Sequence, residues 1–186
     1  WPVAGEVFKE GTYEIESERR GYALELAVDF VRMEYTRHRF WEKDDTPVVP
    51  LKSQTLEDVI ETWPQGKINV RIGDYMFRPH QKWTITAVPD GGGYLGGPYY
   101  KIVIEGTNRA LAATADAEVV TVPEFTGAPE QLWRIDQLTD GTYRIMPKEV
   151  PGTDKELVLV SVGDSTPSLG EFNMNSDNSK WNFRDH

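Results

Sequence analysis

Gln131-Leu132-Trp133 is one of three segments of this chain that end in the same way. The other two are Gln81-Lys82-Trp83 and Ser179-Lys180-Trp181, so that the tryptophans fall 50 and 48 residues apart. Each tryptophan begins or lies within a short β-like run, such as Trp133-Arg134-Ile135-Asp136. Self-similarity at a period of this size indicates a repeat architecture.

A second similarity precedes the tryptophans. It is carried by Gly11-Thr12-Tyr13-Glu14-Ile15, Tyr99-Tyr100-Lys101-Ile102 and Gly141-Thr142-Tyr143-Arg144-Ile145. The two patterns together predict a threefold pseudo-symmetric β domain with one tyrosine and one tryptophan in each repeat. We expect the tryptophans to be buried at equivalent positions. We expect equivalent first strands to begin at Tyr13, Tyr100 and Tyr143.

Strand signals dominate the chain, because its β-branched and aromatic runs are short and separated by Gly, Pro, Asp and Asn. The threefold repeat then selects an all-β fold, the β-trefoil, with a closed barrel and a hairpin cap. We predict one domain over 1–186, with repeats at about 11–90, 98–138 and 141–186. The candidate strands are 11–17, 21–30, 46–51, 69–72, 82–88, 99–104, 109–114, 117–122, 131–137, 142–146, 156–162, 169–173 and 180–183.

The first repeat is enlarged by roughly 32 to 37 residues relative to the other two. Interpreting 46–51 as its third strand divides the surplus into insertions near 28–45 and 52–78. Within the second insertion, 53–63 has the capping residues and the apolar spacing of a short helix. Long insertions of this kind are usually functional or disordered, and the aromatic residues of this one favour order.

Composition narrows the function classes. Thirty acidic and twenty basic residues give a net charge of −10, which disfavours nucleic acid and anionic membranes as partners. The apolar runs are too short for a membrane span, and the compartment stays open between cytoplasmic and secreted. The chain has no cysteine and only three histidines, none at a ligand spacing. We therefore expect neither a metal nor a cofactor.

The C-terminal pattern resembles that of a known superfamily. It resembles the pattern of the ricin-B-type β-trefoil superfamily, especially that of its fungal members. The stretches that carry the resemblance are Trp133-Arg134-Ile135-Asp136, Gly141 to Ile145, Leu157 to Val160 and Asn178 to Phe183. Those members include mushroom lectins and trefoil protease inhibitors. Three Gln-x-Trp-like signatures at this spacing are specific for the fold, and they say much less about function.

In the lectins that the chain resembles, each sugar site needs a carboxylate early in the repeat, which accepts sugar hydroxyl bonds. The corresponding stretches are Ala23-Leu24-Glu25-Leu26, Arg109 to Ala113 and Leu157 to Val160. Only the first contains a carboxylate, Glu25, so the resemblance implies at most one altered sugar site. The loss of the other two favours the inhibitor branch, whose members act through surface loops.

A basic cluster lies in the first insertion, where Arg37 and Arg39 stand beside the aromatic Trp41. A rigid loop could offer one of these arginines to the specificity pocket of a trypsin-like protease. Our leading hypothesis is therefore a protease inhibitor with a protein partner and no enzymatic activity. The alternative is a carbohydrate-binding lectin that uses Glu25, or a lectin-like accessory subunit of another protein.

One motif could suggest catalysis. Val160 to Ser165 resembles the strand-then-Gly-Asp-Ser block of one esterase family. That family needs a full α/β domain after the block, whereas only 21 residues follow Ser165 here. We interpret the block as a strand and a turn.

Overall fold

The computed structural model of the protein describes residues 8–19, 21–28, 56–94, 97–163 and 166–185. Short strands dominate these residues, with one α-helix, α1 (Leu56–Glu61). Three single turns of 3-10 helix precede three of the strands: η1 (Pro79–Gln81), η2 (Pro129–Gln131) and η3 (Asp177–Ser179). The strands are β1 (Gly11–Ser17), β2 (Ala23–Leu26), β3 (Ile68–Gly73), β4 (Trp83–Tyr94), β5 (Gly97–Ile104), β6 (Ala110–Ala113), β7 (Val119–Val122), β8 (Trp133–Gln137), β9 (Tyr143–Pro147), β10 (Val158–Val162), β11 (Thr166–Gly170) and β12 (Trp181–Asp185).

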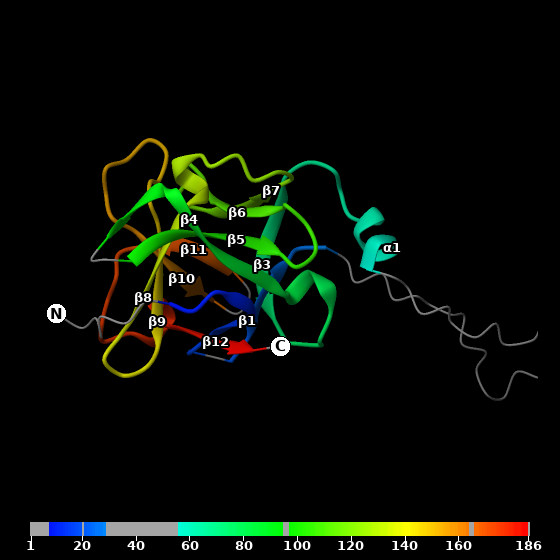
Figure 1. Cartoon of the computed structure of the whole chain (residues 1–186). Helices are drawn as coiled ribbons and strands as arrows, with labels where there is room; N and C mark the ends of the chain where they lie inside the picture. Colours follow the sequence, from blue (N-terminus) through cyan, green and yellow to red (C-terminus); the bar gives the residue numbers. More distant parts are fainter. Residues whose placement is uncertain (1–7, 20, 29–55, 95–96, 164–165, 186) are drawn as a thin grey trace, which may run out of the picture.

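Six of the strands close into a barrel (Figure 1). Their order is β12-β9-β8-β5-β4-β1, and β1 also pairs with β12, which completes the ring. Each repeat contributes its first and fourth strands to this ring, and every pairing within it is antiparallel. Closure leaves no unpaired sheet edge around the barrel.

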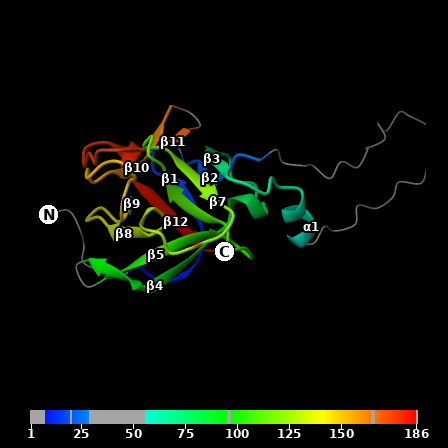
Figure 2. The same ribbon diagram turned by 90° about the horizontal axis from the view of Figure 1, so that it is seen from above.

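The remaining six strands form three hairpins, β2–β3, β6–β7 and β10–β11. One hairpin comes from each repeat, between the two barrel strands of that repeat. A six-stranded barrel with three such hairpins is the β-trefoil that the repeats predict. Figure 2 shows the same arrangement from above.

The three signature tryptophans occupy equivalent positions. Trp83, Trp133 and Trp181 are each fully buried and each begins the fourth strand of its repeat. Each indole Nε1–H donates a 2.9 Å hydrogen bond to a leucine carbonyl of the second strand. The acceptors are Leu24, Leu111 and Leu159. The buried indole thus has the partner that its polar group needs, and it ties each hairpin to the barrel.

The tyrosines obey the same symmetry. Tyr13 lies opposite Trp83 in the β1–β4 ladder, Tyr100 lies opposite Trp133, and Tyr143 lies opposite Trp181. The predicted equivalence of both aromatic sets is therefore confirmed. The predicted strand starts hold only for Tyr143, because β1 begins at Gly11 and β5 begins at Gly97.

Phe8 joins the three repeats through their tyrosines. Its ring centroid lies 5.2 Å from that of Tyr13, 5.6 Å from that of Tyr100 and 5.7 Å from that of Tyr143. The Tyr100 hydroxyl also donates to the Phe8 carbonyl at 2.8 Å. The contacts with Tyr100 and Tyr143 are edge-to-face and the contact with Tyr13 is tilted. Aromatic pairs in favourable geometry add about 0.5–1.5 kcal/mol each beyond area burial. Phe8 consequently links all three repeats, although it lies outside them.

The extra length of repeat one lies within its hairpin. Leu24 and Trp83 are 59 residues apart, whereas the equivalent leucine and tryptophan are 22 apart in the other repeats, a difference of 37. β2 ends at Leu26 and its partner β3 begins at Ile68. The connection between these two strands therefore contains the whole surplus, which includes α1 (Figures 1 and 2).

This arrangement corrects the strand assignment in repeat one. The third strand is β3, within the predicted insertion 52–78, and not 46–51, which lies outside the described residues. Ile68, Val70 and Ile72 alternate with more exposed residues, so the strand can place one face on the core. The helix predicted within 53–63 is confirmed as α1, and the insertion near 28–45 lies outside the described residues except for Val28.

The last hairpin corrects a second assignment. The strand predicted at 169–173 is β11, which begins three residues earlier, because its pairing with β10 extends to Val162 opposite Thr166. In the described part of the chain no helix is long and apolar enough to cross a membrane.

Removal of any one of the three tryptophans should cost similar stability. We expect Trp83→Ala, Trp133→Ala and Trp181→Ala each to lower the free energy of unfolding by about 3–5 kcal/mol, because each leaves a cavity in the core. The corresponding Phe variants should lose about 1–3 kcal/mol, since a buried carbonyl loses its donor. Urea unfolding measures both sets, with the half-exposed Val162→Ala as a control. A near-neutral Ala variant would contradict the threefold equivalence.

Candidate functional site

Glu25 is a buried carboxylate in the second strand of repeat one. It follows Leu24, whose carbonyl accepts the indole bond of Trp83, and only 4% of its surface is exposed. A charged group is rarely buried to this extent unless it is paired. The partners of Glu25 therefore determine what this position can do.

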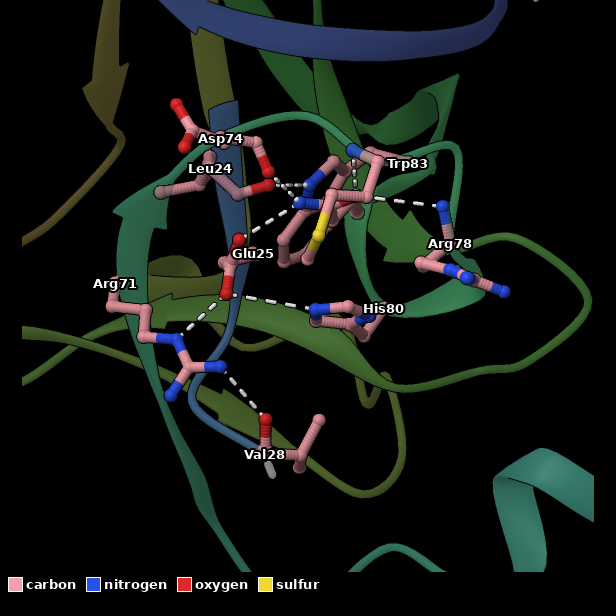
Figure 3. A network of polar contacts seen from close by, with 10 residues as sticks. Leu24, Glu25, Val28, Arg71, Asp74, Arg78, His80 and Trp83 are labelled. Atoms are coloured by element: carbon pink, nitrogen blue, oxygen red, sulfur yellow. Dashed lines mark hydrogen bonds and ion pairs between the residues drawn. The ribbon is translucent and has the colours of Figure 1, made fainter. Parts of the chain in front are cut away.

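Three side chains contact the Glu25 carboxylate (Figure 3). Arg71 Nε donates to Oε2 at 2.6 Å, and Gln81 Nε2 donates to Oε1 at 2.8 Å. His80 Nε2 lies 3.5 Å from Oε2. Arg71 is the member that reaches solvent, with 38% of its side chain exposed, and it also donates to the Val28 carbonyl at 2.8 Å.

These contacts keep Glu25 ionised. Burial by itself would raise the pKa of the carboxyl group, but the hydrogen bonds from His80, Arg71 and Gln81 outweigh burial and lower the pKa below its ordinary value. The site therefore holds a fixed negative charge at neutral pH, next to the positive charge of Arg71.

The same place is apolar or uncharged in the other two repeats. Glu25 pairs across the hairpin with Arg71. In repeat two the equivalent pair is Ala112 with Val120, and in repeat three it is Val160 with Ser168. The equivalence follows from the preceding leucines, which all accept a tryptophan indole bond. Repeat one alone thus carries the charged pair.

Gln81 connects this pair to the loop that follows β3. Its Oε1 accepts the Met76 amide at 2.8 Å, and its Nε2 donates to the Asp74 carbonyl at 2.7 Å as well as to Glu25. Gln131 holds the corresponding loop of repeat two, since its Oε1 accepts the Thr126 amide at 2.7 Å. The signature glutamine therefore positions a loop next to the hairpin in both repeats.

An exposed aromatic residue lies in that loop. Because Met76 corresponds to Thr126, Phe77 corresponds to Gly127, and both have positive φ values, 57° and 85°. A left-handed backbone costs a residue with a side chain roughly 1–2 kcal/mol, whereas glycine adopts it freely. Phe77 is nevertheless 71% exposed, and its ring lies 4.7 Å from that of Tyr75.

The strained backbone and the exposed side chain together make Phe77 a candidate ligand-binding residue. Packing does not explain a bulky aromatic residue in this conformation, since most of its surface is in solvent. Residues held in unfavourable backbone conformations cluster at ligand sites. Tyr75 beside it stays a neutral phenol, because burial and the nearby Glu14 and Glu105 raise its pKa to about 12.

The residues predicted from the sequence have different outcomes. Glu25 lies in a polar cluster as described above, and its role as a sugar ligand stays a prediction. The candidate protease-binding residues Arg37, Arg39 and Trp41 lie outside the described residues. Within the described ranges, no group of three or more His, Cys, Asp or Glu residues could hold a metal ion.

Sequence reasoning missed the partners of Glu25. Gln81 was visible as the first residue of its signature, and the alternation of β3 could have placed Arg71 on the face away from Val70. No sequence signal gave the positive φ of Phe77, which emerges only when its loop is aligned with the glycine of repeat two.

The contacts of Glu25 with Arg71, His80 and Gln81 should make the free energy of unfolding depend on pH. Because the pKa of Glu25 is lowered in the folded protein, the unfolded chain binds a proton more readily. The contribution of Glu25 to the free energy of unfolding is therefore present above its ordinary pKa and is lost as the pH falls through the lowered value. Glu25→Gln should cost about 1–3 kcal/mol at pH 7 and progressively less below about pH 4.5. Denaturant unfolding from pH 7 to 3 measures the difference. A difference that is independent of pH would show that Glu25 is not held as a paired carboxylate.

Comparison with known proteins agrees with the fold. Residues 79–167 match the sequence model of the family described as ricin-type beta-trefoil lectin domain-like. A comparison with curated proteins found no match.

Three solved structures are similar over nearly the whole chain. The first is a mosquitocidal holotoxin (TM-score 0.64, 14% identity), where 97% of this chain matches 18% of the other. The second is the designed threefold-symmetric protein ThreeFoil (TM-score 0.60, 18% identity, 95% and 99% covered). The third is a Polyporus squamosus lectin bound to the epitope Neu5Acα2-6Galβ1-4GlcNAc (TM-score 0.61, 15% identity, 97% and 50% covered).

Coverage differs among these relatives. The chain spans about a fifth of the holotoxin, half of the lectin and nearly all of the designed trefoil. The matching family model describes a lectin-like domain, which agrees better with the lectin alternative than with our leading protease-inhibitor hypothesis. The family match over residues 79–167 and the trefoil neighbours agree with the β-trefoil fold of this chain.

Proposed function

We propose that this protein is a carbohydrate-binding module with a single sugar site, located in repeat one. The observation that carries the proposal is Phe77, an exposed aromatic residue in a strained conformation, held by the Gln81 loop beside the Glu25–Arg71 pair. Aromatic faces next to a few fixed polar groups are the chemistry that pyranose rings require, because each ring has an apolar C–H face and a rim of hydroxyls.

Each member of the site has a distinct role. Phe77 and Tyr75 offer ring surface to the apolar face of a sugar. Arg71, which is partly exposed, donates to sugar oxygens. Glu25 holds Arg71 in place through the 2.6 Å hydrogen bond that Arg71 Nε donates to its carboxylate.

The match of residues 79–167 to the ricin-type beta-trefoil lectin domain-like family supports this proposal. The Polyporus squamosus lectin was solved with a bound glycan. The role is binding and not catalysis.

A glycan array followed by calorimetric titration tests the proposal, with galactosides and Neu5Acα2-6Galβ1-4GlcNAc among the probes. We expect one site per chain, since Ala112 and Val160 replace Glu25 in the other repeats. Phe77→Gly should weaken binding at least about tenfold, because a stacking surface is lost. The free energy of unfolding of the Phe77→Gly variant should change by less than about 1 kcal/mol, since glycine adopts the positive φ freely.

Two further variants sharpen the result. Glu25→Ala should also abolish binding, and Met174→Ala serves as the control, because Met174 is an exposed apolar residue in the corresponding region of repeat three. Two or three sites per chain, or full binding by both Phe77→Gly and Glu25→Ala, would contradict the proposal.

A further inference from the structure

A groove of about 560 Å³ separates helix α1 from repeat two. One wall is the helix with the residues that follow it, and the other consists of the turn after β5 and the residues after β7. The helix is packed closely against this turn, since a Cβ atom on Gly106 would lie 2.5 Å from Leu56 Cδ2. The groove shares no lining residue with the Glu25 site.

Arg109 makes the floor of the groove rigid. Its guanidinium donates to the carbonyls of Gly66 at 2.8 Å and Pro64 at 3.0 Å, and to Thr121 Oγ1 at 3.4 Å. These bonds join the C-terminal part of the long insertion, at Pro64 and Gly66, to the β6–β7 hairpin. Only 7% of Arg109 is exposed. Its guanidinium therefore stabilises the floor of the groove through these hydrogen bonds and presents little charge to the solvent.

The rim of the groove is acidic. Glu57 and Glu61 are four residues apart on α1, so they lie on one face of the helix, and both are exposed. Glu124 lies on the opposite wall, where Asn108 Nδ2 donates to its carboxylate at 2.8 Å. Carboxylates therefore stand on both sides of the groove.

Apolar residues also line the walls between these carboxylates. Ile60 and Trp63 come from the α1 side, and Pro123 comes from the side of repeat two. Trp63 is anchored in the core, since only 8% of its surface is exposed. A ligand that fits must combine hydrocarbon surface with positive charge.

We propose that this groove binds an extended segment of a partner protein that carries lysine or arginine next to apolar residues. The long aliphatic stems of these side chains lie along Ile60, Trp63 and Pro123, and their cationic ends reach the carboxylates on the rim. The net charge of −10 attracts such a segment over a longer range. Glycans lack this positive charge, so the groove complements the sugar site without duplicating it.

Fluorescence anisotropy with labelled Gly-Lys-Leu-Lys-Leu-Gly tests this proposal, with Gly-Glu-Leu-Glu-Leu-Gly as the negative peptide. We expect saturable binding of the basic peptide alone, with amide shifts at Gly106 and Asn108 in ¹H–¹⁵N spectra. The double variant Glu57→Gln, Glu61→Gln should bind about 5- to 30-fold more weakly, as expected for the loss of two exposed ion pairs.

The matched control is Glu149→Gln, Glu171→Gln, which removes the same charge from exposed positions outside the groove. It should bind within about twofold of the unmodified protein, as should Phe77→Gly, which separates this groove from the sugar site. Equal losses in the two double variants would reveal only general charge attraction and overturn the proposal. Absence of saturable binding, or amide shifts confined to other regions, would overturn it as well.

Discussion

The hydrogen bond from a buried indole to a leucine carbonyl is the interaction on which the rest of this structure depends. It occurs three times at 2.9 Å and joins a barrel strand to the hairpin of the same repeat. An unpartnered indole N–H in the core would cost free energy, so each tryptophan specifies where its hairpin packs. The connection inside the hairpin is free of this constraint. That freedom explains how repeat one accommodates 37 additional residues between Leu24 and Trp83 while its strands keep the trefoil pairing.

A scaffold secured in this way can tolerate an unfavourable local feature in one repeat. Repeats two and three fill the middle of the hairpin with uncharged side chains, whereas repeat one buries Glu25 and must pair it. Repeat one also forces Phe77 into the backbone conformation for which repeat two uses Gly127. The strained aromatic residue costs free energy, and the buried charge is tolerated only because its partners offset the cost of desolvation. Their proximity in one repeat is the physical reason for assigning the binding role to that repeat.

The sequence predicts the parts of this fold that repeat. Trp83, Trp133 and Trp181 stand out because symmetry places the same residue at the same spacing, and the position of Glu25 follows by alignment with the other repeats. The partner strand of Glu25 was assigned wrongly, because a long connection separates β2 from β3 and no local pattern encodes their pairing. Arg71 was missed for the same reason. The conformation of Phe77 depends on how Gln81 holds the loop, which is a tertiary effect.

Hydrogen exchange of the indole N–H groups tests the central claim most directly. The protein has six tryptophans, and assignment by single Trp→Phe variants identifies the signals of Trp83, Trp133 and Trp181. If their bonds hold the three hairpins to the barrel, all three should exchange only through global unfolding, with a common free energy equal to that from denaturant unfolding. Exchange of any one through a local opening of much lower free energy would show that its hairpin is held by something else, and would contradict the account.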